Sequence, residues 1–186
     1  MPHKEESKHA LRRAIQYLVH RDRSRDEMVR YLRGKKFSEN IVNETLIFLE
    51  KNDYINDERF ALQFGKISVE NKKIGKLRLG FELGNKGLNK KIIKKTLDSL
   101  YSEYDEKEIA MSCARKKLAT HKPGNSDKNR RRITQFLERK GFASNIIYEV
   151  ATNLVPYTTN NDLDPTRIPD NKPDRMSSLT PKIIQG

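Results

Sequence analysis

Two adjacent carboxylates, Asp57 and Glu58, are the residues in this sequence whose type and spacing most invite a chemical role. They lie in the segment NDYINDERFA, between hydrophobic residues, in a chain with 38 Lys and Arg against 25 Asp and Glu. Neighbouring carboxylates can act as a general acid and base, can bind a metal ion, or can begin a helix by accepting hydrogen bonds from exposed backbone N–H groups. The elements around them decide between these three roles.

The other chemical groups are sparse. Four histidines are present: His3, His9, His20 and His121. None has metal-ligand spacing to another histidine or to Cys113. Gly75-Lys76 lacks the earlier glycine and the Ser or Thr of a phosphate-binding loop, and no carboxylate cluster suits a metal-dependent nuclease. No serine has a histidine nearby in the sequence to activate it, but a pair that the fold brings together in space stays an open alternative. We therefore expect no enzyme activity, no metal and no cofactor.

Composition favours a polyanionic partner in a reducing compartment. The formal net charge is +13 and the pI about 9.8, typical of proteins that bind nucleic acid or an acidic protein surface, although solubility alone also explains such charge. Cys113 is the only cysteine, and its apolar neighbours indicate a buried side chain rather than a reactive thiol. No apolar run approaches the ~20 residues of a membrane span. The N-terminal residues also lack the apolar region of a secretory signal peptide. We expect a cytoplasmic protein without membrane contact.

Three segments within residues 1–155 have similar sequences. They are YLRGKKFSENIVNETLIFL (31–49), ELGNKGLNKKIIKKTLDSL (82–100) and FLERKGFASNIIYEVATNL (136–154). Shifts of 51 and then 54 residues superimpose them, so that Leu32 falls on Leu83 and Leu137. Because apolar residues recur in each segment at helical spacing, the sequence predicts tandem units of three helices.

Start signals precede the predicted middle helices. Ser24, Gly75 and Asn129 occupy equivalent positions, and each residue type can begin a helix. Ser24 and Glu27 also fit a capping box, in which each side chain bonds the other residue's backbone N–H.

The turn after each middle helix has its own pattern. Gly87 and Gly141 mark this turn in the second and third units, but the first unit has Lys36 there. Lys36 must either accept the left-handed dihedral that favours glycine or lie in a turn of different construction.

Asp57 and Glu58 then fall at the start of the first helix of the second unit, and Asp105 and Glu106 fall at the matching place in the third. An acidic residue there accepts hydrogen bonds from free N–H groups and meets the positive end of the helix dipole, which stabilises by about 1 kcal/mol. Because the pattern occurs in two units, we interpret these carboxylates as helix caps rather than catalytic groups.

The sequence thus predicts an all-α fold of three tandem three-helix repeats. The predicted units are residues 1–54, 55–103 and 104–155. Residues 156–186 hold five of the seven prolines and balanced charges without helical or strand periodicity, so we expect a disordered C-terminal tail.

Basic side chains gather where the second and third middle helices begin. The candidates are Lys72, Lys73, Lys76, Arg78, Lys128, Arg130, Arg131 and Arg132. Such side chains can neutralise phosphates or pair with an acidic groove. Each cluster taken alone is equally well explained as a solvated helix face.

Four stretches resemble the RecX family, bacterial regulators of the RecA recombinase. They are RDRSRDEMVRYL (21–32), DYINDERFA (53–61), GKLRLGFELGNKGL (75–88) and FLERKGF (136–142). With the three-unit layout, the resemblance extends over roughly residues 10–154, and YINDERFA is its most distinctive part. Lys36 departs from the usual glycine, and the predicted tail has no family counterpart.

The resemblance implies an elongated, curved arrangement of the three repeats. It also implies a function: binding in the groove of the RecA–DNA filament and inhibiting filament growth, ATP hydrolysis and strand exchange in recombination and DNA repair. The eight basic residues become candidates for contact with the filament or with single- or double-stranded DNA, and we expect a monomer. The alternative is a direct DNA-binding protein with helix-turn-helix-like units.

Overall fold

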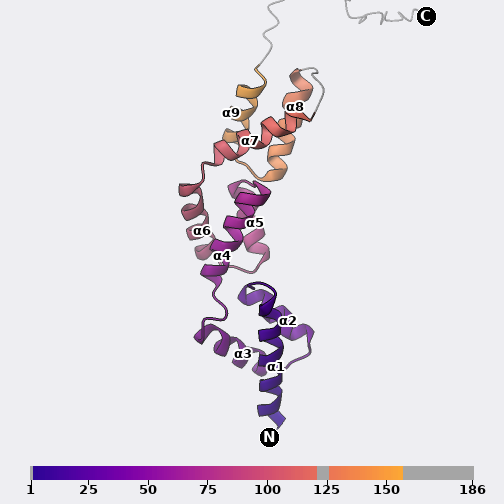
Figure 1. Cartoon of the computed structure of the whole chain (residues 1–186), viewed down its shortest axis with the longest axis vertical. Coiled ribbons are helices and arrows are strands. Elements are labelled where there is room, and N and C mark those ends of the chain that lie inside the picture. The colour runs from indigo at the N-terminus through magenta and orange to yellow at the C-terminus, as the bar shows by residue number, and fades with distance from the viewer. Residues whose placement is uncertain (1, 121–125, 157–186) are drawn as a thin grey trace, which may run out of the picture.

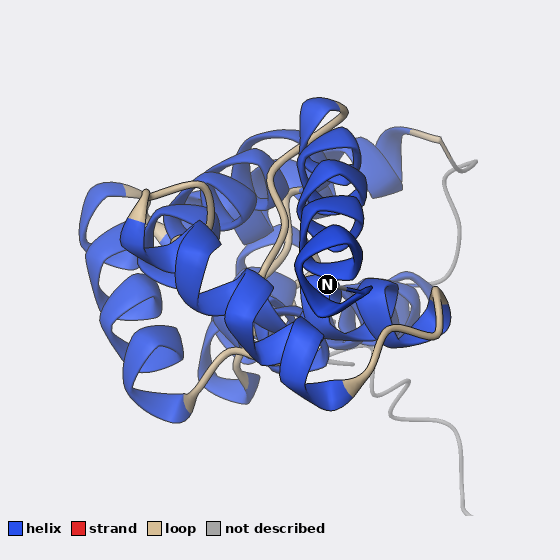
Figure 2. Cartoon of the chain, turned by 90° about the horizontal axis from the view of Figure 1, so that it is seen from below, coloured by secondary structure: helices blue, strands red, loops and turns tan. Residues whose placement is uncertain are grey.

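The computed structural model describes residues 2–120 and 126–156, which form a row of helices along an elongated molecule (Figure 1). No strand occurs in these residues (Figure 2), in agreement with the predicted all-α fold. The elements are α1 (Pro2–Val19), α2 (Arg25–Gly34), α3 (Glu39–Lys51), α4 (Asp57–Ile67), η1 (Ser68–Lys72), α5 (Lys76–Asn85), α6 (Lys90–Glu103), α7 (Glu106–Ala119), α8 (Ser126–Lys140) and α9 (Ser144–Leu154). Apart from Pro156, the predicted tail lies outside the described residues.

Three hydrophobic cores follow one another along the molecule, one in each set of three consecutive helices. We name α1–α3 the first unit, α4–α6 the second unit and α7–α9 the third unit. This arrangement confirms the three tandem three-helix repeats. The residue boundaries between the units stay a prediction, and Ile55 packs in the core of the first unit.

The start of α2 shows how the repeated pattern folds locally. The Ser24 hydroxyl accepts a hydrogen bond from the Glu27 N–H at 3.1 Å, and the Glu27 carboxylate accepts one from the Ser24 N–H at 3.3 Å, which is the predicted capping box. Further along the helix, Met28 and Leu32 are completely buried. Burial of a side chain of this size stabilises by about 2 kcal/mol, so the cap and the apolar face both favour this helix.

The start of α8 differs from the prediction. Asn129 is predicted to precede this helix, but α8 begins at Ser126, so Asn129 lies inside it. Asp127 stands in the first turn, where a carboxylate meets the positive end of the helix dipole, and this favours the earlier start. Ser24 and Gly75 precede α2 and α5 as predicted.

The turn after each middle helix contains one residue with positive φ: Lys36 (65°), Gly87 (78°) and Gly141 (77°). Lys36 therefore accepts the dihedral that glycine adopts freely. The two glycines meet a second requirement, because a Cβ on Gly87 would overlap Asp26 and a Cβ on Gly141 would overlap the backbone nitrogen of Arg78. The turns of the second and third units thus lie directly against the middle helix of the preceding unit.

The carboxylates at the starts of α4 and α7 also join the units. Asp57 accepts a hydrogen bond from the Arg25 N–H at 2.8 Å, at the start of α2, and Glu106 accepts one from the Lys76 N–H at 2.7 Å, at the start of α5. Both side chains cap a helix, as the sequence suggested, but it is the middle helix of the preceding unit and not their own helix.

The helices α4 and α7 have caps of their own. The Asn56 side chain caps α4 by accepting a hydrogen bond from the Arg59 N–H, and the Asp105 side chain caps α7 by accepting from the Lys107 and Glu108 N–H groups. Glu58 pairs with Lys95 of α6 at 2.7 Å. Each of the repeated carboxylates named here therefore has a structural partner.

Candidate functional site

The first predicted group of basic residues surrounds the passage from α4 to α5. The π-helical turn η1 continues α4 and ends at Lys72, and Lys73 follows with positive φ of 50°. The chain then enters α5 at Lys76, with Arg78 in its first turns. Lys72, Lys73 and Arg78 are exposed, whereas Lys76 is half-buried. The turn and the helix start bring these cations together in one part of the second unit.

Glu82 holds two of these cations. Its carboxylate lies 2.9 Å from Lys72 Nζ and 3.1 Å from Arg78 Nε, and its side chain is only 18% exposed. Burial raises the pKa of this carboxyl, but the hydrogen bonds from Lys72 and Arg78 outweigh burial and hold the pKa below its ordinary value. Glu82 is therefore ionised at neutral pH and offsets part of the charge of the group.

Two hydrogen bonds connect this group to the end of α8. Arg78 Nη1 donates to the Arg139 carbonyl at 3.1 Å, and Lys140 Nζ donates to the Lys72 carbonyl at 2.6 Å. They place Arg139 and Lys140 beside the group, two cations that the sequence reasoning missed. A signal for them was present, since both immediately precede the turn glycine that packs on the preceding unit.

The other two members of this group, Lys76 and Lys73, differ in whether they form an ion pair. Lys76 Nζ lies 3.0 Å from the Asp98 carboxylate of α6. The Lys73 ammonium has no ion pair among the described residues, while the Lys73 carbonyl accepts a weak hydrogen bond from Cys113 Sγ at 3.7 Å. Cys113 is buried as predicted, and burial raises the pKa of its thiol, so the thiol is protonated at neutral pH. Lys73 is thus exposed and available to an anionic partner.

The second predicted group lies in the first half of α8. Arg130 donates from Nε and Nη2 to the Val155 carbonyl at 3.2 and 2.6 Å, and this fastens the end of α9 to α8. Lys128, Arg131 and Arg132 are exposed. Within the part of the chain that the structure describes, no hydrogen bond or ion pair holds Arg131 or Arg132. These two guanidinium groups are therefore available to a partner.

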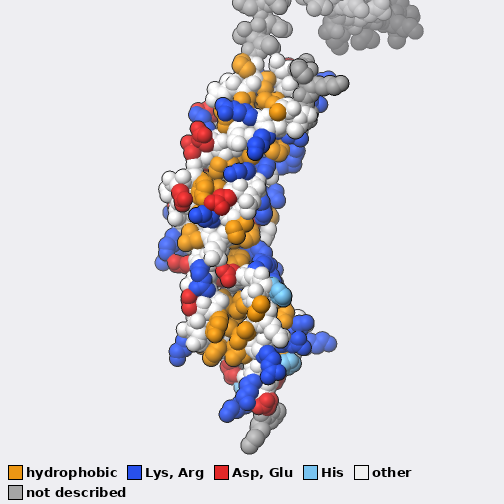
Figure 3. Space-filling model, viewed as in Figure 1, with side chains coloured by type: hydrophobic (Ala, Val, Ile, Leu, Met, Phe, Trp, Pro, Cys, Tyr) orange, Lys and Arg blue, Asp and Glu red, His pale blue; other side chains and the backbone are white. Residues whose placement is uncertain are grey.

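The helix α8 connects the two groups. Arg131 and Arg139 are both exposed and lie eight residues apart, which corresponds to about 12 Å along an α-helix. We name Lys128, Arg131, Arg132 and Arg139 the basic strip of α8. Figure 3 shows that Lys and Arg side chains recur along the whole visible face, interspersed with Asp and Glu. Such a surface can attract phosphates or carboxylates.

Neither a metal site nor a membrane span occurs in residues 2–120 and 126–156. No group of three or more His, Cys, Asp or Glu side chains in these ranges is placed to hold a metal ion. The helices in the same ranges are each too short or too polar to cross a membrane.

Two models of known protein domains match the chain. The first three-helix domain of RecX matches residues 10–49, and the third three-helix domain of RecX matches residues 103–151. The first range lies in the first unit, and the second begins at the last residue of α6 and covers most of the third unit.

Whole proteins match over most of the chain. The regulatory protein RecX of Chlorobium phaeobacteroides (strain BS1) is 34% identical over 144 residues, which are 77% of this chain and 92% of that protein. The regulatory protein RecX of Clostridioides difficile (strain 630) is 31% identical over 148 residues, 80% of this chain and 69% of that protein. The crystal structure of RecX from Lactobacillus salivarius has the same fold, with a TM-score of 0.73 at 24% identity over 81% of this chain and 97% of that chain. Sequence identity over nearly the full length of a RecX protein, together with the repeated three-helix units, shows that this chain belongs to the RecX family.

Proposed function

We propose that this protein binds the RecA–DNA filament and inhibits filament growth, ATP hydrolysis and strand exchange. The observation that carries the proposal is family membership, because the relatives are named regulatory protein RecX and this family acts on the RecA recombinase. The protein then works in recombination and DNA repair by binding, without chemistry of its own.

The elongated shape supports binding to a polymer. Three units in a row are joined by hydrogen bonds between the turn of one unit and the middle helix of the unit before it. Different units of such a body can contact neighbouring protomers of a helical filament. Several weak contacts made by one molecule add up to strong binding.

The charge supports an anionic contact surface. We assign this contact to the basic strip of α8 and to Lys73, because the ammonium of Lys73 and the guanidinium groups of Arg131 and Arg132 are exposed without an ion pair in the described residues. Lys72, Lys76, Arg78 and Arg130 have intramolecular partners, so they contribute to the local potential and would have to break internal bonds to turn toward a ligand.

The decisive experiment compares three targets at one salt concentration: RecA assembled on single-stranded DNA with nucleotide, free RecA, and naked single-stranded DNA of equal length. We expect the tightest binding to the filament, and a fall in ATP hydrolysis at substoichiometric amounts of this protein. Equal affinity for filament and naked DNA, with undiminished hydrolysis, would refute the proposal.

A variant of the basic strip of α8 tests how much the strip contributes to filament affinity. Arg131→Ala with Arg132→Ala should weaken filament binding and flatten its salt dependence, with a slope change near one for each phosphate that is no longer neutralised. Lys90→Ala with Lys94→Ala is the matched control, because it removes the same charge from exposed positions of α6. Equal weakening by both variants would show that net charge, and not the strip, is responsible.

Direct DNA binding is the second candidate function. It is favoured by the exposed Arg131 and Arg132 on the middle helix of a three-helix unit, where cations can meet phosphates. Sequence-specific reading by the third helices is disfavoured in the first unit, since α3 begins with Glu39, which pairs with Arg33 at 2.8 Å and would repel phosphates.

A further inference from the structure

The repeat allows the outer face of α3 to be compared with its equivalents. Ile47 and Phe48 of α3 are large and apolar, yet they are 63% and 43% exposed. The equivalent residues of α6 and α9 are polar: Asp98 and Ser99, and Thr152 and Asn153. Two units therefore form the same fold with polar residues at these positions. The fold therefore does not require Ile47 and Phe48 to be apolar.

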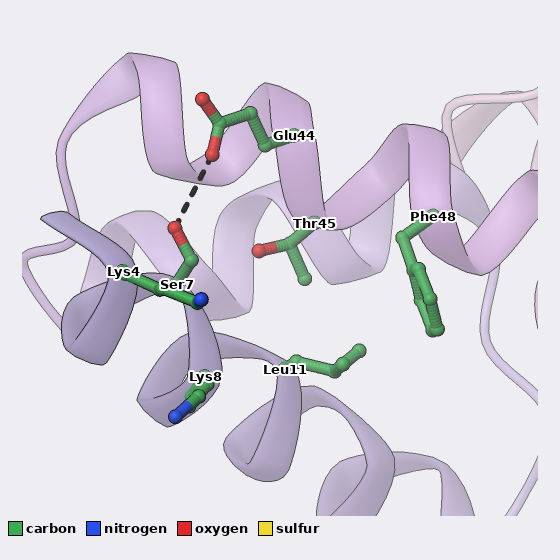
Figure 4. Close-up of a pocket in the computed structure, with 7 residues that line it drawn as sticks. All are labelled: Lys4, Ser7, Lys8, Leu11, Glu44, Thr45 and Phe48. Carbon is green, nitrogen blue, oxygen red and sulfur yellow. Dashed lines mark hydrogen bonds between the residues drawn. The ribbon is translucent and has the colours of Figure 1, made fainter.

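Phe48 lies in a groove between α1 and α3. The groove contains a hollow of about 270 Å³, and Leu11, Thr45 and Phe48 are among its lining residues. Figure 4 shows Leu11 and Phe48 extending into the space between the two helices, while a hydrogen bond of 3.2 Å joins Ser7 to Glu44 at the other end. The groove is therefore bounded at one end and lined by apolar side chains at the other.

The corresponding groove of the second unit is much smaller. The hollow between α4 and α6 measures about 80 Å³, and the ion pair of Glu58 with Lys95 joins these helices at 2.7 Å. In the third unit, an ion pair of Lys107 with Glu149 joins α7 and α9. The α1–α3 groove thus has about three times the volume of its equivalent in the second unit.

The apolar surface continues along α1. A second hollow, of about 320 Å³, shares Lys8 and Leu11 with the first and is also lined by Ile15, which is 37% exposed. From Lys4 to Ile15 the helix is about 16 Å long. Hydrophobic side chains cover much of the end of the visible face that the first unit occupies (Figure 3). This surface can accommodate about three turns of a partner helix.

The edge of the groove formed by α1 is basic. Lys4, Lys8 and Arg12 are exposed and recur at four-residue spacing, which places them in one row on the helix. Lys8 pairs with Glu5 at 2.9 Å, but an exposed pair of this kind contributes little stability. A partner that carries carboxylates beside its apolar face would complement this edge.

We propose that the α1–α3 groove binds an acidic amphipathic helix of the protein component of the filament. This inference rests on the proposed function and deepens it, because it assigns protein contact to the first unit. The apolar face of the helix covers Leu11, Ile15 and Phe48, and its carboxylates meet the three cations on α1. Nucleic acid fits the groove less well, since Phe48 is the one aromatic ring among its lining residues that could stack on a base.

The test replaces Phe48, which lines the groove, by the residue that the third unit has at the same position, Phe48→Asn. Because α9 is a helix with Asn at this position, the circular dichroism spectrum and the Tm of the variant should match those of the wild type. We expect about a tenfold or greater loss of affinity for RecA assembled on single-stranded DNA. Affinity for naked single-stranded DNA should be unchanged.

Two further variants separate the groove from other surfaces. Leu77→Thr with Phe81→Asn removes an exposed apolar pair, on α5 and outside the groove, and should leave filament affinity unchanged. Lys4→Gln, Lys8→Gln and Arg12→Gln together should weaken filament binding several-fold and reduce its salt dependence, as expected for an acidic partner.

The possible outcomes are distinguishable. If the Phe48 variant binds the filament as tightly as the wild type, the groove assignment is wrong and the proposed function stands. If the wild type itself fails to bind the filament, both are wrong. An equal loss toward naked DNA would make the groove a nucleic-acid site. A wild-type dimer that the variant converts to monomer in sedimentation would make it a contact between two copies. Either result overturns the proposal.

Discussion

The two junctions between consecutive units are built alike. In each, the end of the middle helix and the turn after it in the later unit pack against the earlier unit. Three consecutive residues of the later unit face the earlier one: Asn85, Lys86 and Gly87 at the first junction, and Arg139, Lys140 and Gly141 at the second. At both junctions the first two carbonyls accept hydrogen bonds from the earlier unit. The acceptors are backbone atoms, so the conformation of the turn places them whatever the side chains are.

The donors at the first junction are side chains. The Ser24 hydroxyl donates to the Lys86 carbonyl at 2.6 Å, and the Arg30 guanidinium donates to the Asn85 carbonyl at 3.3 Å. Lys86 Nζ also pairs with the Glu27 carboxylate at 2.7 Å.

The donors at the second junction include the backbone itself. The Gly75 N–H donates to the Lys140 carbonyl at 2.8 Å, and the Leu77 N–H donates to the Gly141 carbonyl at 3.1 Å. Main chain therefore lies closer to main chain here than at the first junction. The first junction should be more sensitive to the loss of a side chain, and the second to the addition of a Cβ.

The largest effect should come from Gly141→Ala. Its Cβ would overlap the backbone nitrogen of Arg78, and φ of 77° is unfavourable for alanine, so we expect the free energy of unfolding to fall by about 3 kcal/mol or more. Gly87→Ala should cost less, about 2 kcal/mol, because its Cβ would overlap the side chain of Asp26. Urea unfolding measures both variants.

Lys36→Gly is the matched control for these two variants. Lys36 has the same left-handed conformation and is exposed, so glycine should raise the free energy of unfolding by up to about 1 kcal/mol. Equal losses at positions 87 and 141 would contradict the difference between the junctions.

A loss comparable to that of Gly87→Ala should come from Ser24→Ala, also at the first junction. The completely buried hydroxyl caps α2 and donates to the Lys86 carbonyl, so its loss should lower the free energy of unfolding by about 2 kcal/mol. Ser38→Ala is the control, because Ser38 precedes α3 without a side-chain capping bond. A comparable loss at Ser38 would show that the junction bond is unimportant.

A smaller effect should appear in the pH dependence of Asp57→Asn. Burial raises the pKa of Asp57, although the bond from the Arg25 N–H opposes it. Between the ordinary and the raised pKa, the folded protein binds more protons than the unfolded chain, so the contribution of Asp57 to the free energy of unfolding falls as pH rises. The stability of the variant relative to the wild type should therefore rise with pH. Burial also raises the pKa of Glu106, so Glu106→Gln should follow the same trend.

Glu82→Gln should show the opposite trend. The pKa of Glu82 is held below its ordinary value, so its contribution to stability is present above the ordinary pKa and is lost as pH falls through the lowered one. The stability of this variant relative to the wild type should therefore fall as pH rises. Urea unfolding across the acidic range measures all three variants, and parallel curves for Asp57→Asn and Glu82→Gln would contradict the assigned signs.

The smallest effect on stability should come from Arg131→Ala with Arg132→Ala. Neither residue has a partner in the described part of the chain, so the free energy of unfolding should change by less than about 0.5 kcal/mol. Arg78→Ala with Arg130→Ala removes the hydrogen bonds to the Arg139 and Val155 carbonyls and should cost about 2 kcal/mol. Thermal unfolding of the two double variants distinguishes cations that serve the fold from cations free to bind.

Local patterns in the sequence were sufficient to predict the helices. The equivalent residues Leu32, Leu83 and Leu137 are all completely buried, because apolar spacing determines which face of a helix is buried. The same spacing does not determine the first residue of a helix. The start of α8 was therefore misplaced at Asn129, although Ser126 lies at the first turn.

The candidate site could be predicted only in part, because its cations were visible in the sequence and their partners were not. Arg78 and Glu82 are four residues apart, a spacing at which side chains on a helix meet, so their ion pair could be predicted from the sequence. The bond from Arg78 to the Arg139 carbonyl depends on how the third unit packs. Ile47 and Phe48 were equally visible, but apolar residues on a helix indicate burial until a structure shows them exposed.

The turn at Lys36 differs from the two turns that join the units. At each junction between units, a turn with positive φ packs against the start of a middle helix. Neither Gly87 nor Gly141 has room for a Cβ in these turns. Lys36 gives its turn the same conformation but adds a Cβ and a cation. The turn at Lys36 therefore lacks the bare backbone that Gly87 and Gly141 present at the two internal junctions.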